Sequence, residues 1–343
     1  MSGRAAILLA GGAGTRLWPL STDETPKQFL RLFDGRSLLQ IAFDRIRRAI
    51  PAERIFVSTN ERYRPQVEAQ LPSLAAANVL VEPARRNTAP AIAVCSSEVA
   101  ARLGDDPEIG IFPSDHFVAD EEAFITAVER AYAFAGAEPY LVTIGIDPDH
   151  PNTGFGWLEL GETLEPGVIR LLRFVEKPQR EKAEEFLRAG NVVWNGGMFV
   201  WRSSTFDAVL RAVAPEIASV LDAWRAAPAE ERREIYERMP SISIDFAVME
   251  KAPNVATVRG RFGWSDVGSW KAVAAIVGRG RENGVIRDDA SSALVHADGR
   301  RPVVVIGVEN VAIVDAPEGL LVIDLEKSEL LSGVVKRLDR HEA

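Results

Sequence analysis

The sequence contains only one cysteine, Cys95, and four histidines in 343 residues. An internal disulfide and a thiolate metal cluster both need more than one cysteine. Both are therefore excluded, and a reducing cytoplasm is the expected location. The histidines also lack the spacing of zinc ligands, because His150, His296 and His341 form no ligand pattern with His116.

Long apolar runs and an excess of positive charge are absent as well. No run reaches the roughly 18 apolar residues of a membrane span, so we expect no membrane partner. The chain has 40 Lys and Arg against 49 Asp and Glu, a formal net charge of −9. A field of this sign argues against nucleic acid as the main partner, although it permits a local cationic pocket.

The composition and the first part of the chain indicate an α/β fold. Hydrophobic residues make up 47% of the chain and charged residues 26%, which is ordinary for a globular protein. Short apolar runs then alternate with amphipathic stretches, as in βαβ units. We predict a Rossmann-like, mixed and mostly parallel sheet flanked by helices. Its strands are expected at 5–10, 54–58, 78–81, 108–112 and 140–144, with helices near 37–49, 61–71, 89–103 and 120–135.

The pattern changes twice further along the chain. Between 155 and about 275 strands and helices mix, which indicates an insertion that completes the same domain and covers its ligand edge. From residue 281 short β-type runs with turns prevail. We therefore predict one large domain at 1–280 and a small C-terminal β domain at 281–343. In the insertion, strands are expected at 155–160, 167–175 and 192–201, and helices at 179–189, 203–238 and 245–251.

A glycine-rich loop directly follows the first predicted strand. The strand ends at Ala10 and continues into Gly-Gly-Ala-Gly-Thr-Arg, residues 11–16. Glycines there let backbone N–H groups approach an anion. The loop is neither a P-loop nor a dinucleotide fingerprint, because it lacks the Gly-Lys-Ser/Thr ending and the third glycine. Arg16 and Lys27 could clamp a triphosphate, or the loop could be a tight turn with two solvated cations.

Residues 8–20, Leu-Leu-Ala-Gly-Gly-Ala-Gly-Thr-Arg-Leu-Trp-Pro-Leu, followed by Pro-Lys-Gln-Phe at 26–29, resemble the signature of the sugar-1-phosphate nucleotidyltransferases. The similarity is greatest to the mannose-1-phosphate guanylyltransferase branch and spans residues 5–275. It implies a nucleotidyltransferase fold, similar to glycosyltransferase A, for residues 1–280. The other matching blocks are at 82–91, 113–116, 145–156, 174–178, 194–199 and 264–270.

The resemblance implies a reaction, a metal and a set of nucleotide-binding residues. The expected reaction joins GTP and α-D-mannose 1-phosphate into GDP-mannose and diphosphate, with Mg²⁺ or another divalent cation. Asp115 and Asp266 are the expected metal ligands, and Arg16 and Lys27 complete the expected catalytic set. The expected nucleotide-binding residues are Leu9, Ala10, Gly11, Gly12, Gly14, Thr15, Arg16, Lys27, Glu82, Asn87, Thr88 and Ser114, with Asn87 at the guanine.

Local structure offers an alternative for several of these residues. Asp115 could cap the next helix and Asp266 could form a turn, because aspartate commonly does both. Thr88 could be the N-cap of the helix near 89–103. Asp147-Pro148-Asp149 resembles a glycosyltransferase metal motif, but its proline favours a plain turn.

The sugar phosphate is expected to bind at Gly154, Phe155, Gly156, Glu176, Lys177 and Asn195. Two glycines beside an aromatic suit close approach to a sugar ring, and many family members carry tyrosine in place of Phe155. A carboxylate, an ammonium and an amide could contact hydroxyls and phosphate. The alternatives are a solvated strand end at Glu176 and Lys177 and a hairpin turn at Asn195-Gly196.

Other functions remain open at this point. The same chemistry could act on glucose 1-phosphate with UTP or dTTP, and the fold could serve a non-catalytic nucleotide-sugar sensor or, less simply, a glycosyltransferase. A sensor should have lost a cation or a metal carboxylate, whereas Arg16, Lys27, Asp115 and Asp266 are all present. The apolar β-type runs after residue 281 also suggest a homodimer.

Overall fold

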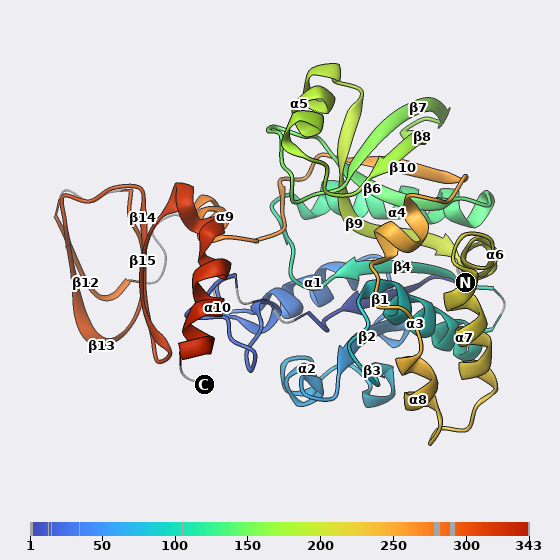
Figure 1. Ribbon diagram of the computed structural model, residues 1–343, viewed down its shortest axis with the longest axis horizontal. Coiled ribbons are helices and arrows are strands. Elements are labelled where there is room, and N and C mark those ends of the chain that lie inside the picture. Colours follow the sequence, from blue (N-terminus) through green and yellow to red (C-terminus); the bar gives the residue numbers. More distant parts are fainter. Residues whose placement is uncertain are drawn as a thin grey trace. The chain divides into compact units, whose positions relative to one another are not determined.

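A nine-stranded sheet forms the centre of the first of two compact units in the computed structural model (Figure 1). The structure describes residues 3–12, 14, 16–33, 35–104, 106–277, 282–288 and 292–341. The first unit comprises residues 1–11, 42–114 and 118–264, and the second comprises residues 12–41, 115–117 and 265–343. The boundary that we predicted at 280 and 281 lies outside the described residues, and the units divide the chain elsewhere.

The sheet of the first unit is mixed and mostly parallel, as predicted. Its strand order is β3-β2-β1-β4-β9-β6-β10-β8-β7, and only β8 and β9 run against the others. The strands are β1 (Ala5–Leu9), β2 (Ile55–Asn60), β3 (Val79–Glu82), β4 (Glu108–Pro113), β6 (Leu141–Ile146), β7 (Trp157–Glu165), β8 (Val168–Val175), β9 (Val192–Arg202) and β10 (Val255–Gly260).

Helices flank this sheet and complete its core. α3 packs against β1 and β2, whereas α4 packs against β4, β6, β9 and β10. Large side chains such as Trp157, Trp201 and Tyr132 are almost fully buried, and Cys95 is buried in the same unit. The helices are α2 (Arg64–Gln70), α3 (Thr88–Leu103), α4 (Glu121–Ala137), α5 (Arg180–Ala189), α6 (Ser203–Val213), α7 (Pro215–Ala226) and α8 (Arg232–Glu237); α1 (Leu38–Ile46) spans a unit boundary.

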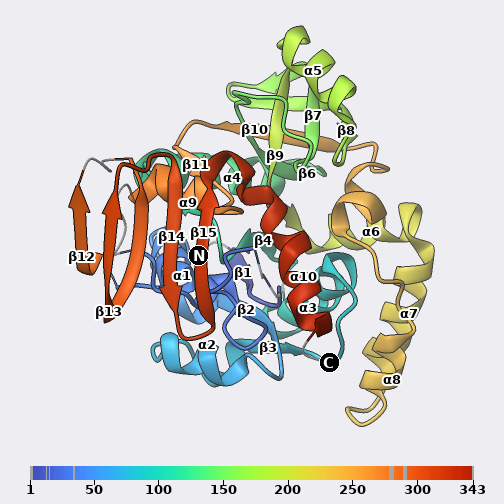
Figure 2. The same cartoon turned by 60° about the vertical axis from the view of Figure 1, so that its left-hand side comes forward.

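The second unit contains a four-stranded sheet in the order β12-β13-β14-β15, with α10 beside it (Figure 2). Leu17, Leu38 and Trp270 share its apolar core with Leu294 and Val314. Its elements are β12 (Glu282–Asp288), β13 (Leu294–Ile306), β14 (Val311–Ala316), β15 (Gly319–Asp324), α9 (Trp270–Val277) and α10 (Leu331–His341), and the short strands β5 (Phe117–Val118) and β11 (Trp264–Ser265) pair with each other.

Three local predictions were wrong. Asn195 and Gly196 do not form a hairpin turn, because β9 runs through them and only shifts its register with β6 there. Asn87, not Thr88, is the N-cap of α3, and its backbone has a positive φ of 68°. The C-terminal segment is not all β, since it ends in α10.

The predicted strands did not include β5, β10 or β11, of which β10 lies inside the large sheet. Among the described residues, no helix combines the length and the apolar character that crossing a membrane requires.

Candidate active site

Four of the predicted side chains meet in the second unit, and we call Arg16, Lys27, Asp115 and Asp266 the lysine cluster. Lys27 Nζ lies 2.9 Å from Asp115 Oδ2 and donates a hydrogen bond to the backbone oxygen of Asp266. Arg16 Nη1 lies 3.9 Å from Asp266 Oδ2. The expected catalytic residues are thus connected through Lys27, which is only 7% exposed.

Local structure explains the position of Lys27. Pro26 precedes a 3₁₀ turn, Lys27–Phe29, that starts at the lysine. Gly14 packs beside the stem of this lysine, since a Cβ built on it would lie 3.4 Å from Lys27 Cβ. Gln28 Nε2 donates to the carbonyl of Gly12 over 3.0 Å and ties the glycine loop to this turn. A cavity of about 120 Å³ is lined by Gly12, Gly14, Arg16, Lys27, Gln28 and Asp115.

The cations of the cluster keep Asp115 ionised at neutral pH. Burial alone would raise the pKa of its carboxyl group, but the charges of Lys27, His116 and Arg16 outweigh burial and hold the pKa below its usual value. His116 Nε2 lies 3.9 Å from Asp115 Oδ1. Asp115 does not cap a helix, because Asp120 is the N-cap of α4.

Asp266 combines a turn with the cluster. Its Oδ1 accepts a hydrogen bond from the backbone N–H of Gly268 over 3.2 Å, which is the turn that the sequence offered as an alternative. Its Oδ2 is the atom that faces Arg16. The turn therefore fixes the carboxylate without using both oxygens.

These two carboxylates fit Mg²⁺ bound jointly with phosphate. Within the described ranges, no group of three His, Cys, Asp or Glu side chains is arranged to hold a metal. Mg²⁺ does not need such a cage, since one or two carboxylates with phosphate oxygens and waters are its usual ligands. Asp115 Oδ2 lies beside Lys27 Nζ and Asp266 Oδ2 faces Arg16 Nη1, so each carboxylate has a cationic neighbour in the lysine cluster.

The predicted nucleotide residues of the first unit are anchored on its strands. Ser114 Oγ donates to the carbonyl of Leu9 over 2.6 Å, and the N–H of Ala10 donates to the carbonyl of Ser58 over 2.7 Å. A Cβ on Gly11 would lie 3.0 Å from Glu82 Oε1, so a larger residue here would press on the Glu82 carboxyl group. Thr15 lies outside the described residues.

Asn87 and Thr88 carry helix contacts in addition to their predicted role. Asn87 Oδ1 accepts from the N–H of Thr88 over 2.8 Å, and Thr88 Oγ1 accepts from the N–H of Ile244 over 2.9 Å. The Asn87 side chain is exposed. Its oxygen caps α3, so a base contact by Asn87 would use the amide nitrogen.

Glu82 is a perturbed carboxyl group at the end of β3. Burial raises its pKa to about 7, although the hydrogen bond from Ser58 Oγ, 2.8 Å long, acts in the opposite direction. The side chain is therefore close to half protonated at neutral pH. Such a shift in a carboxyl group at the carboxyl end of a parallel strand is typical of a functional position.

All the predicted sugar-site residues meet in the first unit, and we call Gly154, Phe155, Gly156, Glu176, Lys177 and Asn195 the Glu176 cluster. Asn195 N–H donates to the carbonyl of Gly156 over 2.8 Å, and Lys177 N–H to the carbonyl of Phe155 over 3.2 Å. The N–H of Gly154 donates to Asn152 Oδ1 over 2.6 Å. The residues come from β9, the end of β8 and the loop before β7.

The charged pair of this cluster is not a solvated strand end. The Glu176 side chain is 5% exposed and lies 2.8 Å from Lys177 Nζ, whereas the Lys177 side chain is 57% exposed. A Cβ on Gly156 would lie 2.6 Å from Glu176 Oε2, so a larger residue there would displace the Glu176 carboxylate. The Phe155 ring has edge contacts with Trp194 and Trp264, each with centroids 5.2 Å apart, and so forms an aromatic wall.

Sequence reasoning missed Asp245, which joins this cluster. Asn195 Nδ2 donates to Asp245 Oδ1 over 3.0 Å. The predicted helix at 245–251 is a single π-helical turn, Asp245–Met249, and Asp245 is its first residue. An aspartate at the start of a helical segment looks like a cap in sequence, so no signal distinguished it.

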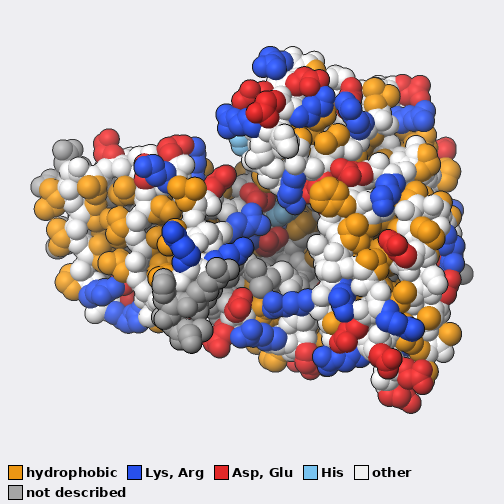
Figure 3. Space-filling view, viewed as in Figure 1, with side chains coloured by type: hydrophobic (Ala, Val, Ile, Leu, Met, Phe, Trp, Pro, Cys, Tyr) orange, Lys and Arg blue, Asp and Glu red, His pale blue; other side chains and the backbone are white. Residues whose placement is uncertain are grey.

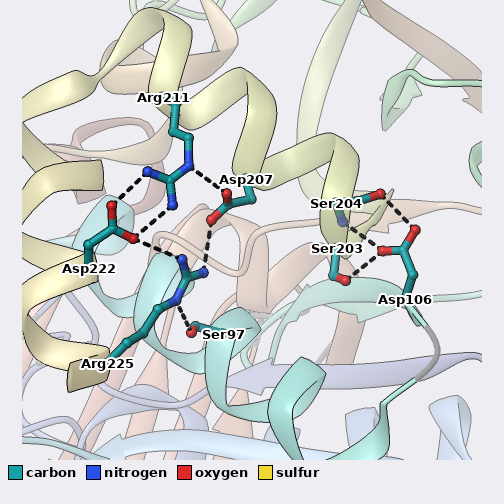
Figure 4. A network of polar contacts seen from close by, with 8 residues as sticks. All are labelled: Ser97, Asp106, Ser203, Ser204, Asp207, Arg211, Asp222 and Arg225. Atoms are coloured by element: carbon teal, nitrogen blue, oxygen red, sulfur yellow. Dashed lines mark hydrogen bonds and ion pairs between the residues drawn. The ribbon is translucent and has the colours of Figure 1, made fainter.

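Two other polar groups have structural partners. Asp147, from the motif resembling a metal site, forms ion pairs with Arg259 and Arg261. On α6 and α7, Arg211 and Arg225 bridge Asp207 and Asp222, while Asp106 binds Ser203 and Ser204 (Figure 4). None of the residues drawn in Figure 4 is a predicted site residue. The ion pairs of Arg211 and Arg225 join α6 to α7.

Comparison with known proteins gives consistent matches. Residues 5–278 match the family model described as Nucleotidyl transferase. Xanthan biosynthesis protein XanB of Xanthomonas campestris pv. campestris is 38% identical over 98% of this chain and 74% of its own length. A Klebsiella pneumoniae protein named mannose-1-phosphate guanylyltransferase is 35% identical with the same coverage. A Thermus thermophilus structure described as mannose-1-phosphate geranyltransferase superposes with a TM-score of 0.87 at 34% identity, over 98% of this chain and 99% of that one.

The shifted pKa of Glu82 predicts a pH-dependent effect of Glu82→Gln. Because burial raises the pKa to about 7, protonation of Glu82 stabilises the folded state of the wild type. This contribution to the free energy of unfolding is fully present near pH 4 and is lost as the pH rises through 7. Glutamine cannot ionise, so the variant should gain about 1–3 kcal/mol relative to the wild type between pH 5 and pH 8. Urea unfolding at the two pH values measures this gain. An equal stability difference at both would contradict the predicted burial of the charge.

Proposed function

Because this chain belongs to the nucleotidyl transferase family, we infer that it is an enzyme that makes GDP-mannose and diphosphate from GTP and α-D-mannose 1-phosphate. Relatives at 34–36% identity that are named mannose-1-phosphate guanylyltransferase support the substrate pair. The observation that carries the chemistry is the lysine cluster, in which one buried ammonium contacts Asp115 and the backbone of Asp266.

The reaction needs charge neutralisation more than it needs a base. An oxygen of the sugar phosphate attacks the α-phosphorus in line, the bond from that phosphorus to the bridging oxygen breaks, and diphosphate leaves with the electron pair. The attacking oxygen is already anionic at neutral pH, so no proton has to be removed. Repulsion between the two polyanions is the main barrier, and positioning with electrostatic stabilisation lowers it.

Arg16 and Lys27 supply the positive charge in this proposal. Arg16 can bind two phosphate oxygens with its planar guanidinium, and Lys27 acts as a point charge held in place by Asp115. Asp115 and Asp266 would hold Mg²⁺, which when bound would neutralise phosphate charge and orient the triphosphate. Since all four residues precede position 281, we retain residues 1–280 as the catalytic segment.

The nucleotide and the sugar phosphate are assigned to the residues predicted for them. Backbone groups of the glycine loop would face the triphosphate, and Glu82 and Asn87 the guanine. In the Glu176 cluster, the exposed Lys177 ammonium would bind the sugar phosphate, and Glu176 and Asn195 the hydroxyls. Phe155 would form the apolar wall of this pocket without the hydroxyl of tyrosine. A nucleoside triphosphate substrate and a single cysteine favour the cytoplasm.

The small sheet of the second unit supports a homodimer. Val304, Ile306, Leu320 and Val322 on β13 and β15 are 53–63% exposed, and hydrophobic side chains gather over this sheet in Figure 3. Contiguous apolar patches of this kind commonly mark interfaces between proteins. We propose that the patch binds the same patch of a second copy.

The dimer proposal predicts a change of mass in Ile306→Asp/Val322→Asp. Two carboxylates on each patch would have to be buried unpaired in the dimer, which is strongly unfavourable. The wild type should have twice the 37.5 kDa mass of one chain by light scattering after size exclusion, and the double variant the mass of one. A monomeric wild type would remove the proposal.

The substrate assignment predicts the outcome of a crossed assay of diphosphate release. GTP, ATP, UTP and dTTP are each combined with mannose, glucose and N-acetylglucosamine 1-phosphate in the presence of Mg²⁺. Release should be confined mainly to GTP with mannose 1-phosphate. Preference for another pair would keep the mechanism and refute the substrates, and no release from any pair by folded protein would favour a sensor.

The metal assignment predicts that Asp266→Asn folds normally and loses at least about a hundredfold in kcat, the scale of one lost preorganised electrostatic contact. The amide keeps the hydrogen bond from Gly268, because its oxygen can still accept. Steady-state kinetics with saturating Mg²⁺, with a thermal melt as the folding control, measure the effect. Near-normal turnover would exclude Asp266 from the metal site.

A further inference from the structure

Asp245 adds a second carboxylate to the Glu176 cluster. Its Oδ1 accepts a 3.0 Å hydrogen bond from Asn195 Nδ2, and Asn195 is only 8% exposed. The aspartate belongs to the turn Asp245–Met249, whereas Asn195 belongs to β9, so the contact joins elements that lie far apart in sequence.

Backbone geometry decides which way the Asn195 amide points. The N–H of Gly197 lies 3.2 Å from Asn195 Oδ1, and a backbone N–H can only donate. Thr143 Oγ1 donates to the same oxygen over 2.9 Å. The amide nitrogen must therefore face the other side, where Asp245 is its acceptor. Asp245 completes the set of contacts that fixes the amide in one orientation.

The charge of Glu176 disfavours ionisation of Asp245. Burial, and next the charge of Glu176, raise the pKa of Asp245 to about 6, while Lys177 and the Ser243 hydroxyl act in the opposite direction. Lys177 Nζ is engaged by Glu176 at 2.8 Å. Each carboxylate already has one partner, Asn195 Nδ2 for Asp245 and Lys177 Nζ for Glu176, and each has further lone pairs that can accept from a ligand with several hydroxyl groups.

A sugar ring is the ligand whose chemistry meets this requirement. Each hydroxyl is a donor, and a carboxylate accepts through either oxygen. Mannose and glucose differ only in the direction of one ring hydroxyl, so a pair of fixed acceptors can distinguish them. Sites that bind a hydroxyl by hydrogen bonds discriminate strongly, because a missing donor leaves a buried acceptor unpaired.

We propose that Asp245 is a positioning and specificity residue for the sugar 1-phosphate: it fixes the Asn195 amide and accepts a hydrogen bond from a ring hydroxyl beside Glu176. The proposal rests on the proposed function, since it takes the Glu176 cluster as the sugar site. It adds a residue that acts on sugar binding and leaves the triphosphate and the transfer step unchanged.

The variant Asp245→Asn tests the proposal in the full chain. It keeps the shape, and its amide oxygen can still accept from Asn195 Nδ2, but the other carboxylate oxygen becomes an NH2 group that cannot accept from a ring hydroxyl. The KM for mannose 1-phosphate should rise about tenfold to a hundredfold, and the preference for mannose over glucose 1-phosphate should fall at least about tenfold. The KM for GTP should stay within about twofold, because the change does not touch the triphosphate site.

A matched control removes a carboxylate elsewhere in the first unit. Asp222→Asn breaks contacts with Arg211 and Arg225 only, as drawn in Figure 4, and should leave both KM values and the sugar preference unchanged. If Asp245→Asn does not fold, Asp245→Glu keeps the charge but moves it by one methylene, and should lose sugar preference in the same way.

The outcomes separate this proposal from the proposed function. A wild type that turns over no pair refutes the function, and calorimetric titration of mannose 1-phosphate into wild type and variant then still tests Asp245 by the ratio of the two Kd values. An active wild type with unchanged KM and sugar preference in Asp245→Asn overturns the proposal. If Asp245→Asn raised the KM for mannose 1-phosphate, glucose 1-phosphate and GTP equally, Asp245 would have a merely structural role. That result would also overturn the proposal.

Discussion

The Lys27 ammonium is the interaction on which the second unit depends. This unit consists of three separate segments, 12–41, 115–117 and 265–343, and Lys27 lies in the first. Its Nζ contacts Asp115 in the second segment and the backbone of Asp266 in the third. A lysine that is 7% exposed needs such partners, because an unpaired buried charge is strongly destabilising. One side chain therefore joins all three segments and, in the proposed reaction, also faces phosphate.

Three carboxyl groups of the proposed site have different electrostatic surroundings. Asp115 lies beside cations that lower its pKa, whereas burial dominates at Glu82 and Asp245 and raises theirs to about 7 and about 6. A group that holds a metal between phosphates must be ionised throughout the physiological range. Groups that recognise hydroxyls or a base can tolerate partial protonation until the ligand supplies its donors. The environments thus agree with the different roles proposed.

Much of the fold could be predicted from apolar periodicity. The runs at β1, β2 and β4 are short, continuous and buried, as parallel strands in the middle of a sheet require. The same reasoning failed for the Asn195-Gly196 pair, a dipeptide typical of hairpins. At this point of β9, Asn195 pairs with Gly145 of β6 on one side and donates to Gly156, just before β7, on the other, and this pairing overrides the turn preference. The positive φ of Asn87 could likewise not be predicted by a rule based on average N-cap preferences.

The candidate site was predictable only where residues lie in motifs. The glycine loop, Glu176 with Lys177, and Asp115 each follow a strand, so their place at a strand end could be inferred. The place of Asp245 could not be inferred, because its contact with Asn195 arises from the packing of a turn against β9. The sequence of neither segment indicates that it contacts the other. Tertiary neighbours of this kind decide ligand preference but leave no local pattern.

The buried cysteine has a practical consequence for biophysical work. Cys95 lies in the apolar core of the first unit, and burial raises the pKa of its thiol, so the thiolate form that reacts with maleimides is scarce. A cysteine introduced at an exposed position would then be the one reactive thiol of the labelled protein. Fluorophores can accordingly be attached site by site in the native background, without first removing Cys95 and leaving a cavity in the core.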